Sequence, residues 1–416
     1  MACRRSLTGV TLVAFALLAT ACADRQRRNP LDPEAEAPLQ VASPLAAVAG
    51  DRQVRLAWNY TYFGDVTAVR LYRSDGEGDL VRQLAPADTA LLDEAVTNGV
   101  TYAYRLSLQV AGEGERFLDD TVLATPGPEV VWLADGSSGL VWQISPDGRT
   151  ARFARGRFYW LSGLAVNLAD GSCWVSDGRT RGLYRISRDG EVSLRPARIG
   201  QPGDVSLDPA GRVGWVTDRQ SRTVHSFVPD ARSDSLDLVE VDASFEDPVS
   251  LAGLGDACWI ADQQADRVLL YRRDGVRLGE WHGLAGPVQV VASTARPEVA
   301  WVLADEGQQV LRLAVGEPVV STDLPFSPVA AIRADLGSGE CWVLGPAQVA
   351  AVDAGGAAVL QLAVPEDGVD LAADDGAGHL WLARSKDLWK LAVPGLPRAQ
   401  LVGFGQVLEI EVDPGR

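Results

Sequence analysis

The feature that most restricts the fold is a short two-strand pattern that returns along the chain. In its clearest copies it reads CWVSDGRTRGLYRISRDG from Cys173, CWIADQQADRVLLYRRDG from Cys258 and VWLADGSSGLVWQISPDG from Val131. The tryptophans that mark the copies are separated by 42, 41, 44, 42, 41 and 39 residues. They are Trp132, Trp174, Trp215, Trp259, Trp301, Trp342 and Trp381. A repeat of this length indicates one structural unit that buries its apolar surface against its neighbours.

Each repeat has the same internal order of strands. An apolar strand comes first, such as PVSLAGL from Pro248 or PVQVVAS from Pro287, and a Gly- and Asp-rich turn follows it. The Trp strand, a polar turn, a third strand, a DG-type turn and a more polar fourth strand complete the unit. No 3.6-residue periodicity indicates the helix pairs of a helical solenoid. The pattern predicts a β-propeller over residues 127–416, with one four-stranded sheet per repeat and seven blades.

The two ends of the repeat region predict how the ring closes. The first Trp strand, EVVWLAD from Glu129, has no inner strand before it, whereas GQVLEIEVD follows the last unit from Gly405 to Asp413. We expect this C-terminal strand to complete the first blade. Closure of this kind removes free sheet edges and joins the two ends of the ring.

The repeated Trp, Asp and Cys residues predict packing rather than chemistry. The Trp strand is apolar on both faces, as expected of a sheet between two neighbours. The Asp of the W-x-x-D pattern can begin the next turn by accepting local backbone hydrogen bonds. Cys173, Cys258 and Cys341 each precede a repeat Trp. They would lie in three different blades, too far apart for a disulfide or a zinc site, and are expected to be small buried apolar residues.

Residues 40–126 carry alternating strands with polar turns, among them AVRLYRS and ALLDEAVTNGVTYAYRLSLQV. The pattern resembles a fibronectin type III domain, a two-sheet β-sandwich. The resemblance implies that Trp58 is a core residue and that Tyr102 is the corner tyrosine that bonds back to the backbone. The predicted fold class is therefore all-β, a fibronectin III-like sandwich plus a propeller. We expect the sandwich to be a spacer or packing domain.

The chain begins like an exported protein. Arg4 and Arg5 precede the apolar run Val10 to Leu18, and LATAC then ends at Cys22. Residues 1–21 resemble a bacterial lipoprotein signal peptide, which implies lipidation of Cys22 and attachment to the membrane there. The alternative is ordinary secretion, with cleavage after ATA. Residues 22–39 read as a tether that contains NPLDP.

The lipoprotein resemblance implies a location in the cell envelope, as an outer-membrane lipoprotein on the periplasmic or the outer side. Ala23 follows Cys22, where an Asp would favour retention in the inner membrane. The formal net charge of −17 argues against a nucleic-acid partner, because the chain as a whole repels polyanions.

Strand order also predicts where a binding site would lie. The turns after the Trp strands and the connections between blades should meet at one face of the ring. That face would gather aromatic and basic residues, which are typical of a binding surface. They are Tyr159, Trp160, Arg179, Arg181, Arg219, Arg222, Trp281, His282 and Phe326. The alternative is that some of the aromatic residues plug the ring or pack on the first module.

Catalytic residues are hard to find. We expect His225 in a third strand, His282 in a connection and His379 in a turn of the opposite face, so the three histidines would not converge on a metal. No Ser-His-Asp arrangement or phosphate loop is evident. We therefore predict no catalytic residue, no metal and no cofactor.

The repeats resemble NHL-type and YVTN-type propellers, such as streptogramin lyases and gluconolactonase-like proteins. The resemblance leaves two hypotheses. The first is a lipid-anchored binding or scaffold protein that presents the propeller to a protein, peptide or glycan. The second is a metal-dependent hydrolase or lyase with its site at the channel mouth. Its candidate ligands would be Asp204, Asp370, Glu409, Glu411 and Asn167. Carboxylates that converge would favour the enzyme, and a mouth of apolar and Arg side chains would favour binding.

Overall fold

The computed structural model describes residues 45–60, 65–74, 79–195, 199–230, 235–242, 244–335, 338–374, 379–392, 396–402 and 404–413. This part is all-β, apart from one 3-10 turn at Asp305–Gly307 (η1). None of its helices is long and apolar enough to cross a membrane. The predicted signal peptide, the tether and Cys22 lie outside the described residues. The chain divides into two compact units, with a boundary between Thr125 and Pro126, and the short segment Ala49–Arg52 groups with the second unit.

The first unit contains two antiparallel sheets. One sheet has the order β1 (Leu45–Gly50), β2 (Gln53–Trp58), β5 (Ala90–Asp93). The other has the order β4 (Asp79–Leu84), β3 (Val66–Ser74), β6 (Tyr102–Val110), β7 (Gly114–Ala124). Trp58 is buried in the core of this unit, as the sequence predicts. The hydroxyl of Tyr102 accepts a hydrogen bond from the backbone N–H of Thr97 at 2.9 Å, which is the back-bonding expected of a corner tyrosine.

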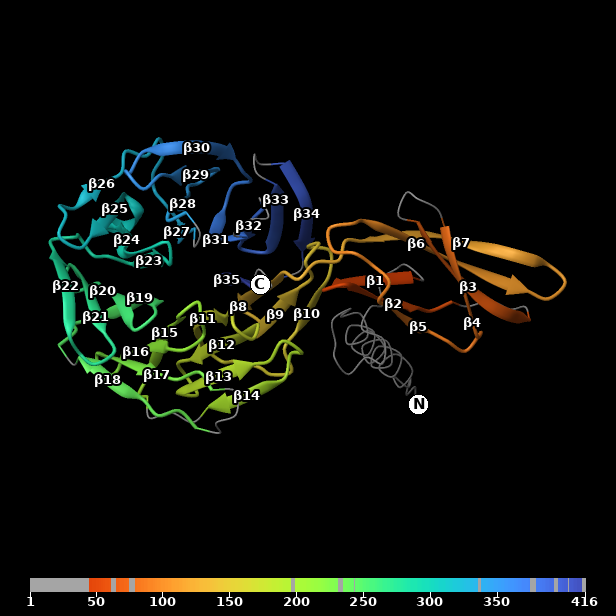
Figure 1. Cartoon of the computed structure of the whole chain (residues 1–416), viewed down its shortest axis with the longest axis horizontal. Helices are drawn as coiled ribbons and strands as arrows, with labels where there is room; N and C mark the ends of the chain where they lie inside the picture. Colours follow the sequence, from red (N-terminus) through yellow and green to blue (C-terminus); the bar gives the residue numbers. More distant parts are fainter. Residues whose placement is uncertain are drawn as a thin grey trace, which may run out of the picture. The chain divides into compact units, whose positions relative to one another are not determined.

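The second unit is a ring of four-stranded antiparallel sheets, seven of which lie in its described residues (Figure 1). We number the sheets along the chain and give each from its inner to its outer strand. The first sheet is β35 (Val407–Asp413), β8 (Val130–Asp135), β9 (Leu140–Ile144) and β10 (Ala151–Phe153). The second is β11 (Leu161–Asn167), β12 (Ser172–Asp177), β13 (Gly182–Ile186) and β14 (Val192–Arg195). The third is β15 (Pro202–Leu207), β16 (Gly214–Asp218), β17 (Thr223–Phe227) and β18 (Val239–Asp242).

The remaining four sheets follow the same order. The fourth is β19 (Pro248–Leu254), β20 (Ala257–Asp262), β21 (Arg267–Arg272) and β22 (Arg277–His282). The fifth is β23 (Gln289–Ser293), β24 (Arg296–Ala304), β25 (Gln309–Ala314) and β26 (Val320–Ser321). The sixth is β27 (Ala331–Ala334), β28 (Cys341–Leu344), β29 (Gln348–Val352) and β30 (Ala358–Ala363). The seventh is β31 (Gly368–Asp374), β32 (His379–Arg384), β33 (Asp387–Ala392) and β34 (Leu396–Val402).

The ring closes as the sequence predicts. Strand β35 at the C-terminal end pairs antiparallel with β8, so that Ile410 lies opposite Leu133. A buried ion pair reinforces the seam, because Lys390 Nζ of the seventh sheet lies 2.6 Å from Glu129 Oε2, just before β8. In Figure 1 the first strand of each sheet lies toward the centre of the ring and the last strand toward its outside.

The repeated tryptophans pack between neighbouring sheets. Six of them are at most 1% exposed, and the seventh, Trp342, is partly buried. Trp174 of the second sheet, for example, packs on Phe227 of the third, with ring centroids 5.2 Å apart. Cys173 and Cys258 are fully buried beside these tryptophans, and burial raises the pKa of both thiols. The packing role predicted for these residues is confirmed.

Candidate functional site

Buried aspartates hold one end of the ring together. Asp177, at the end of the second Trp strand, accepts hydrogen bonds from the N–H groups of Arg179 and Thr180 in its own turn. Its carboxylate also accepts from Tyr159 and Trp160 in the connection that leads into the sheet. The turn and the connection therefore lie at the same end of the sheet, as strand order predicts. We call this end of the ring, with its turns and connections, the rim.

The same arrangement recurs in other sheets. Asp135 accepts from Ser137 and Ser138 of its own turn and from Gly405 and Gln406 of the preceding connection. Asp218 accepts from Gln220 and Ser221 and from Gly200 and Gln201. Asp262 accepts from Glu246 and Asp247 of its connection. The rim backbone is therefore repeated from sheet to sheet, and the side chains that it carries differ.

The second sheet carries an aromatic pair at these connection positions. Tyr159 and Trp160 stand where the first and third sheets have Gly405–Gln406 and Gly200–Gln201. Their N–H groups lie 2.8 and 3.2 Å from the Asp177 carboxylate, so their backbone is held in place. Their side chains are nevertheless 63% and 56% exposed. The rim therefore presents two large aromatic rings to solvent on a fixed backbone.

The turns of the second and third sheets carry four arginines, one of which contacts this pair. The guanidinium carbon of Arg179 lies 5.3 Å from the centroid of the Tyr159 ring, a cation–π distance. Arg181 and Arg222 are exposed at matching positions of neighbouring turns, with φ of 57° and 58°. Arg219 lies over the start of the third inner strand, because a Cβ built on Gly203 would be 3.0 Å from its Cγ. All four arginines lie on the second and third sheets.

The other predicted face residues lie on different sheets. Trp281 and His282 end strand β22 of the fourth sheet, whereas the sequence placed them in a connection. The ring of Trp281 packs on the core Trp259 with centroids 4.9 Å apart. His282 Nε2 lies 3.3 Å from Glu280 Oε1. Phe326 is half-buried against Gly345 of the sixth sheet. Trp281 and Phe326 therefore contribute to packing.

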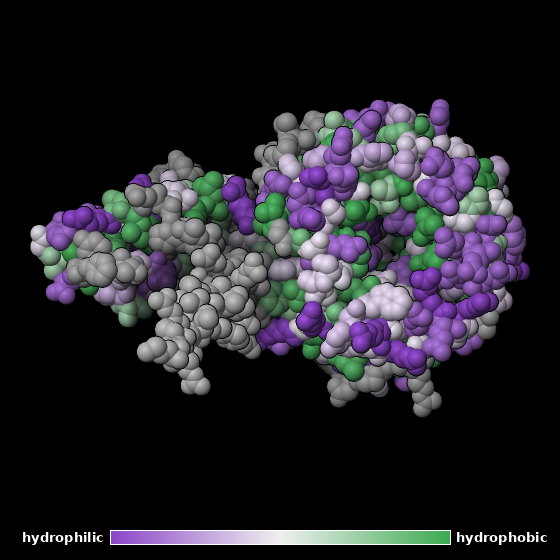
Figure 2. All heavy atoms as spheres, turned by 180° about the vertical axis from the view of Figure 1, so that it is seen from behind, coloured by the Kyte–Doolittle hydropathy of each residue, from purple (hydrophilic) through white to green (hydrophobic). Residues whose placement is uncertain are grey.

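A channel passes through the centre of the ring, and the face drawn in Figure 2 is hollowed there. Leu161, Ser162 and Gly163, which directly follow Trp160, line the part of the channel nearest the rim. A cavity of about 180 Å³ lies further along it. The aromatic pair therefore directly precedes the strand that lines this part of the channel.

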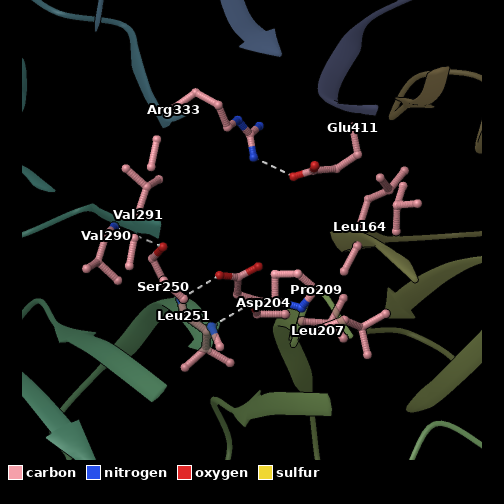
Figure 3. A pocket seen from close by; sticks show the side chains of 18 of the residues that line it. Leu164, Asp204, Leu207, Pro209, Ser250, Leu251, Val290, Val291, Arg333 and Glu411 are labelled. Atoms are coloured by element: carbon pink, nitrogen blue, oxygen red, sulfur yellow. Dashed lines mark hydrogen bonds and ion pairs between the residues drawn. The ribbon is translucent and has the colours of Figure 1, made fainter. Parts of the chain in front are cut away.

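The channel wall contains a cluster of carboxylates around one arginine, Arg333 of β27. Its guanidinium hydrogen-bonds Glu411, and its Nη2 lies 3.2 Å from Asp370 Oδ2 and 3.1 Å from the Ile410 carbonyl oxygen. Figure 3 shows Arg333 and Glu411 pointing toward each other. The sequence analysis missed Arg333, although it is the only basic residue in any inner strand. That pattern could have revealed it.

Polar side chains of the channel also join adjacent inner strands. Each accepts a hydrogen bond from a backbone N–H of the next inner strand around the ring. The pairs are Glu409 with Leu164, Asp204 with Leu251, Ser250 with Val290, Gln289 with Ile332, and Asp370 with Ile410. Figure 3 shows two of these bonds, at Asp204 and Ser250. The inner-strand acids therefore have a structural role as links between sheets.

Burial raises the pKa of the channel carboxyl groups and so favours their protonated forms. It raises the pKa of Asp204 to about 7, although hydrogen bonds from Leu251 and Val205 oppose the shift. The pKa of Glu409 is raised well above its usual range by burial and by the nearby charge of Asp204. Burial also raises the pKa of Asp370 and Glu411, although Arg333 acts in the opposite direction.

Comparison with known proteins identifies the fold of the ring. No protein-family model and no curated protein sequence matches the chain. Apo AztD from Citrobacter koseri is 12% identical over 68% of this chain and 97% of its own, with a TM-score of 0.53. A putative 6-phosphogluconolactonase from Bacteroides uniformis is 16% identical over 68% and 99%, with a TM-score of 0.52. A streptogramin B lyase structure is 15% identical over 61% and 87%, with a TM-score of 0.50.

The ring is a β-propeller. At these identities the likeness concerns the fold alone, because propellers with the same architecture have many functions.

The propeller channel has no evident metal site. Among the described residues, no group of three or more His, Cys, Asp or Glu could hold a metal ion. Asn167 caps a turn through a 3.0 Å hydrogen bond to its Oδ1 from the N–H of Ala169. His225 lies in β17 and pairs with Thr223. His379 begins β32, whereas the sequence placed it in a turn, and its side chain lies outside the described residues.

Proposed function

We propose that the chain is a non-catalytic binding protein of the cell envelope. The second sheet of the propeller presents Tyr159 and Trp160 to a protein, peptide or glycan partner. One observation carries the proposal: two adjacent aromatic side chains are more than half exposed on a backbone that Asp177 holds in place. Large exposed aromatic residues on a rigid support are typical of the residues that dominate binding energy in interfaces.

The proposal includes the finer architecture. We take each four-stranded sheet of the ring as one blade of a seven-bladed propeller closed by β35. We take the first unit as a fibronectin type III-like sandwich that acts as a spacer. The pairing of β35 with β8 and the Tyr102 hydrogen bond support these assignments. The Cys22 motif supports a lipid anchor and an outer-membrane location.

We favour binding over a metal-dependent hydrolase or lyase in the channel. Of the inner-strand acids that would serve as metal ligands, Asp204, Asp370 and Glu409 accept backbone hydrogen bonds from neighbouring strands, and Asp370 and Glu411 pair with Arg333. A metal would have to compete with these bonds for the carboxylate oxygens. Thermal melting with calcium and with a chelator tests the alternative, since a resident metal would raise the melting temperature.

The double variant Tyr159→Ala/Trp160→Ala tests the proposed binding function. Both side chains are exposed, so folding should be preserved. The variant should lose capture of partners from an envelope extract in a comparison by quantitative mass spectrometry. Phe117→Ala, which removes a 46% exposed aromatic ring from the first unit, is the matched control and should capture the same set as the natural chain. If the double variant captured the same partners as the natural chain, the proposed binding role of Tyr159 and Trp160 would be wrong.

A further inference from the structure

Two arginines of the rim, Arg181 and Arg222, occupy a backbone position that does not favour them. The last residue of the turn after the Trp strand is Gly139 in the first sheet, Arg181 in the second, Arg222 in the third and Asp266 in the fourth. All four have positive φ, between 49° and 67°. Glycine adopts this conformation without strain, and Asp tolerates it better than most residues do. Arginine at two successive turns therefore indicates that the side chain itself is needed there.

The charges of these arginines are available at the surface. Within the described residues, no carboxylate pairs with Arg181 or Arg222. Arg219 is partly engaged, because its Nη2 lies 3.4 Å from Asp247 Oδ1, and its side chain is 48% exposed. Arg179 lies over the ring of Tyr159. A chain with a net charge of −17 thus carries four exposed arginines in the turns of the second and third sheets, and one of them lies over the exposed Tyr159 ring.

The chemistry of the rim matches carboxylates better than it matches the hydroxyls of a neutral sugar. Guanidinium groups only donate hydrogen bonds, and their planar geometry suits carboxylates. The Asp177 carboxylate already accepts from four backbone N–H groups. The exposed charged side chains of these two turns are all arginines, and the nearby Asp247 carboxylate already pairs with Arg219. Trp, Tyr and Arg are also the residues that most often dominate protein–protein contacts.

We infer that the segment bound at this rim is an acidic peptide segment of a partner protein. Its carboxylates pair with the arginines of the second and third sheets, and an adjacent residue packs on Tyr159 and Trp160. The inference depends on the proposed binding function of the rim. Asp266 occupies the matching position in the fourth sheet, so the acidic segment lies over the second and third sheets and ends before the fourth.

The test uses the full chain and a fluorescein-labelled octaglutamate peptide, with binding measured by fluorescence anisotropy. A neutral octapeptide of alternating Gly and Ser is the reference. Octaglutamate should bind at least about 10-fold more tightly than the neutral peptide in 50 mM NaCl, and 300 mM NaCl should weaken it, because salt screens exposed charges. Equal binding of the two peptides would overturn the inference.

The variant Arg181→Gly/Arg222→Gly should weaken octaglutamate binding about 3–10-fold, the effect of two exposed ion pairs. The matched control is Asp266→Gly, which makes the same replacement at the same positive φ in the next turn and should not weaken binding. The melting temperature should not fall in the double arginine variant, because glycine is relaxed at positive φ. Asp266→Gly also removes the acceptor of the 2.7 Å hydrogen bond from the Gly286 N–H, so a lower melting temperature is expected of this control alone. Unchanged binding by the double arginine variant would overturn the inference.

Two further probes separate the ligand class from the binding site itself. Polygalacturonate presents carboxylates on a sugar chain, and phosphatidylglycerol vesicles present an anionic membrane. If either binds through these arginines while octaglutamate does not, the peptide inference is wrong and the rim still binds a ligand. If Tyr159→Ala/Trp160→Ala loses partner capture while the natural chain binds octaglutamate no more tightly than the neutral peptide, the proposed function survives without the acidic peptide.

Discussion

Two turns of the rim have the same backbone hydrogen bonds and carry different side chains at the surface. In Asp135–Gly139 and in Asp177–Arg181 a buried Asp accepts hydrogen bonds from its own turn and from the preceding connection. The first turn reads DGSSG and its connection provides Gly405–Gln406. The second reads DGRTR and its connection provides Tyr159–Trp160.

This comparison separates the residues that build the propeller from those that could bind a partner. A feature shared by both turns, such as the Asp, is explained by the fold. A feature found in one turn only needs another explanation. The aromatic pair and the arginines belong to the second class, and their removal should therefore affect binding more than folding.

Deletion of residues 405–416 should have the largest effect on stability, and it acts on the first of the two turns. It removes β35 from the first sheet and two of the four backbone N–H donors of Asp135, and it leaves the bonds of Asp177 in place. We expect the ring to open, expose the edge of β8 and lose its cooperative unfolding transition. Thermal unfolding and size-exclusion chromatography measure this.

Deletion of residues 414–416 alone is the control, and it should leave the transition unchanged. A cooperative, monomeric 1–404 chain would show that the C-terminal strand does not close the ring.

Asp135→Ala and Asp177→Ala should have similar effects on stability. Each substitution leaves several backbone N–H groups without an acceptor, and we expect the free energy of unfolding to fall by about 3 kcal/mol. Urea unfolding of both variants gives the values. If Asp177→Ala kept full stability and lost only partner binding, Asp177 would belong to the binding site and the shared structural role would be wrong.

The sequence predicts most of the propeller because each strand repeats a local pattern. The tryptophan period, the polar turns and the extra strand at Gly405 to Asp413 indicate the ring and its closure. The W-x-x-D pattern also predicts that Asp177 begins a turn. Its bonds to Tyr159 and Trp160 could not be read from that pattern, because they join segments brought together only by the folded sheet.

The candidate site is less predictable for the same reason. Trp281 looks like a surface aromatic residue in the sequence. In the structure β22 extends to His282, and the ring of Trp281 packs on Trp259. Arg333 looks like one basic residue in an apolar strand, and only the ring brings it to Asp370 and Glu411. Contacts between sheets decide such roles, and the repeat pattern describes each sheet by itself.

Gly139→Ala tests the last position of the first turn, where the second turn has Arg181. A Cβ on Gly139 would lie 2.1 Å from the carbonyl oxygen of Phe158, and φ is 67°. We expect the free energy of unfolding to fall by about 2 kcal/mol, from strain and the displaced backbone. Arg181→Ala is the matched control and should change it by less than about 0.5 kcal/mol, since the position already holds a non-glycine residue. Equal losses in the two variants would mean that the first turn does not require glycine.

The free energy of unfolding should depend on pH in opposite ways through Asp135 of the rim and Asp204 of the channel. This is the smallest of the predicted effects. Burial acts to raise the pKa of Asp135, but hydrogen bonds from Gly405 and Gln406 outweigh it and the pKa is lowered. Asp135 therefore stabilises the fold above its unfolded pKa of about 3.9, and this contribution is lost as the pH falls. Burial raises the pKa of Asp204 to about 7, so this carboxyl has the opposite effect.

The folded state holds the Asp204 proton more tightly than the unfolded chain does between about pH 4 and 7, so stability should decrease as the pH rises through this range. Asp204→Asn keeps an acceptor for the Leu251 N–H and cannot ionise. Between pH 5 and 8 the natural chain should lose about 1–2 kcal/mol more of its free energy of unfolding than this variant, measured by urea unfolding at each pH. Parallel pH profiles for the two chains would show that the Asp204 proton is not held by the fold. The Asp204 carboxyl group would then be ionised at neutral pH. Binding of a cation by this carboxylate would become an alternative to its structural role.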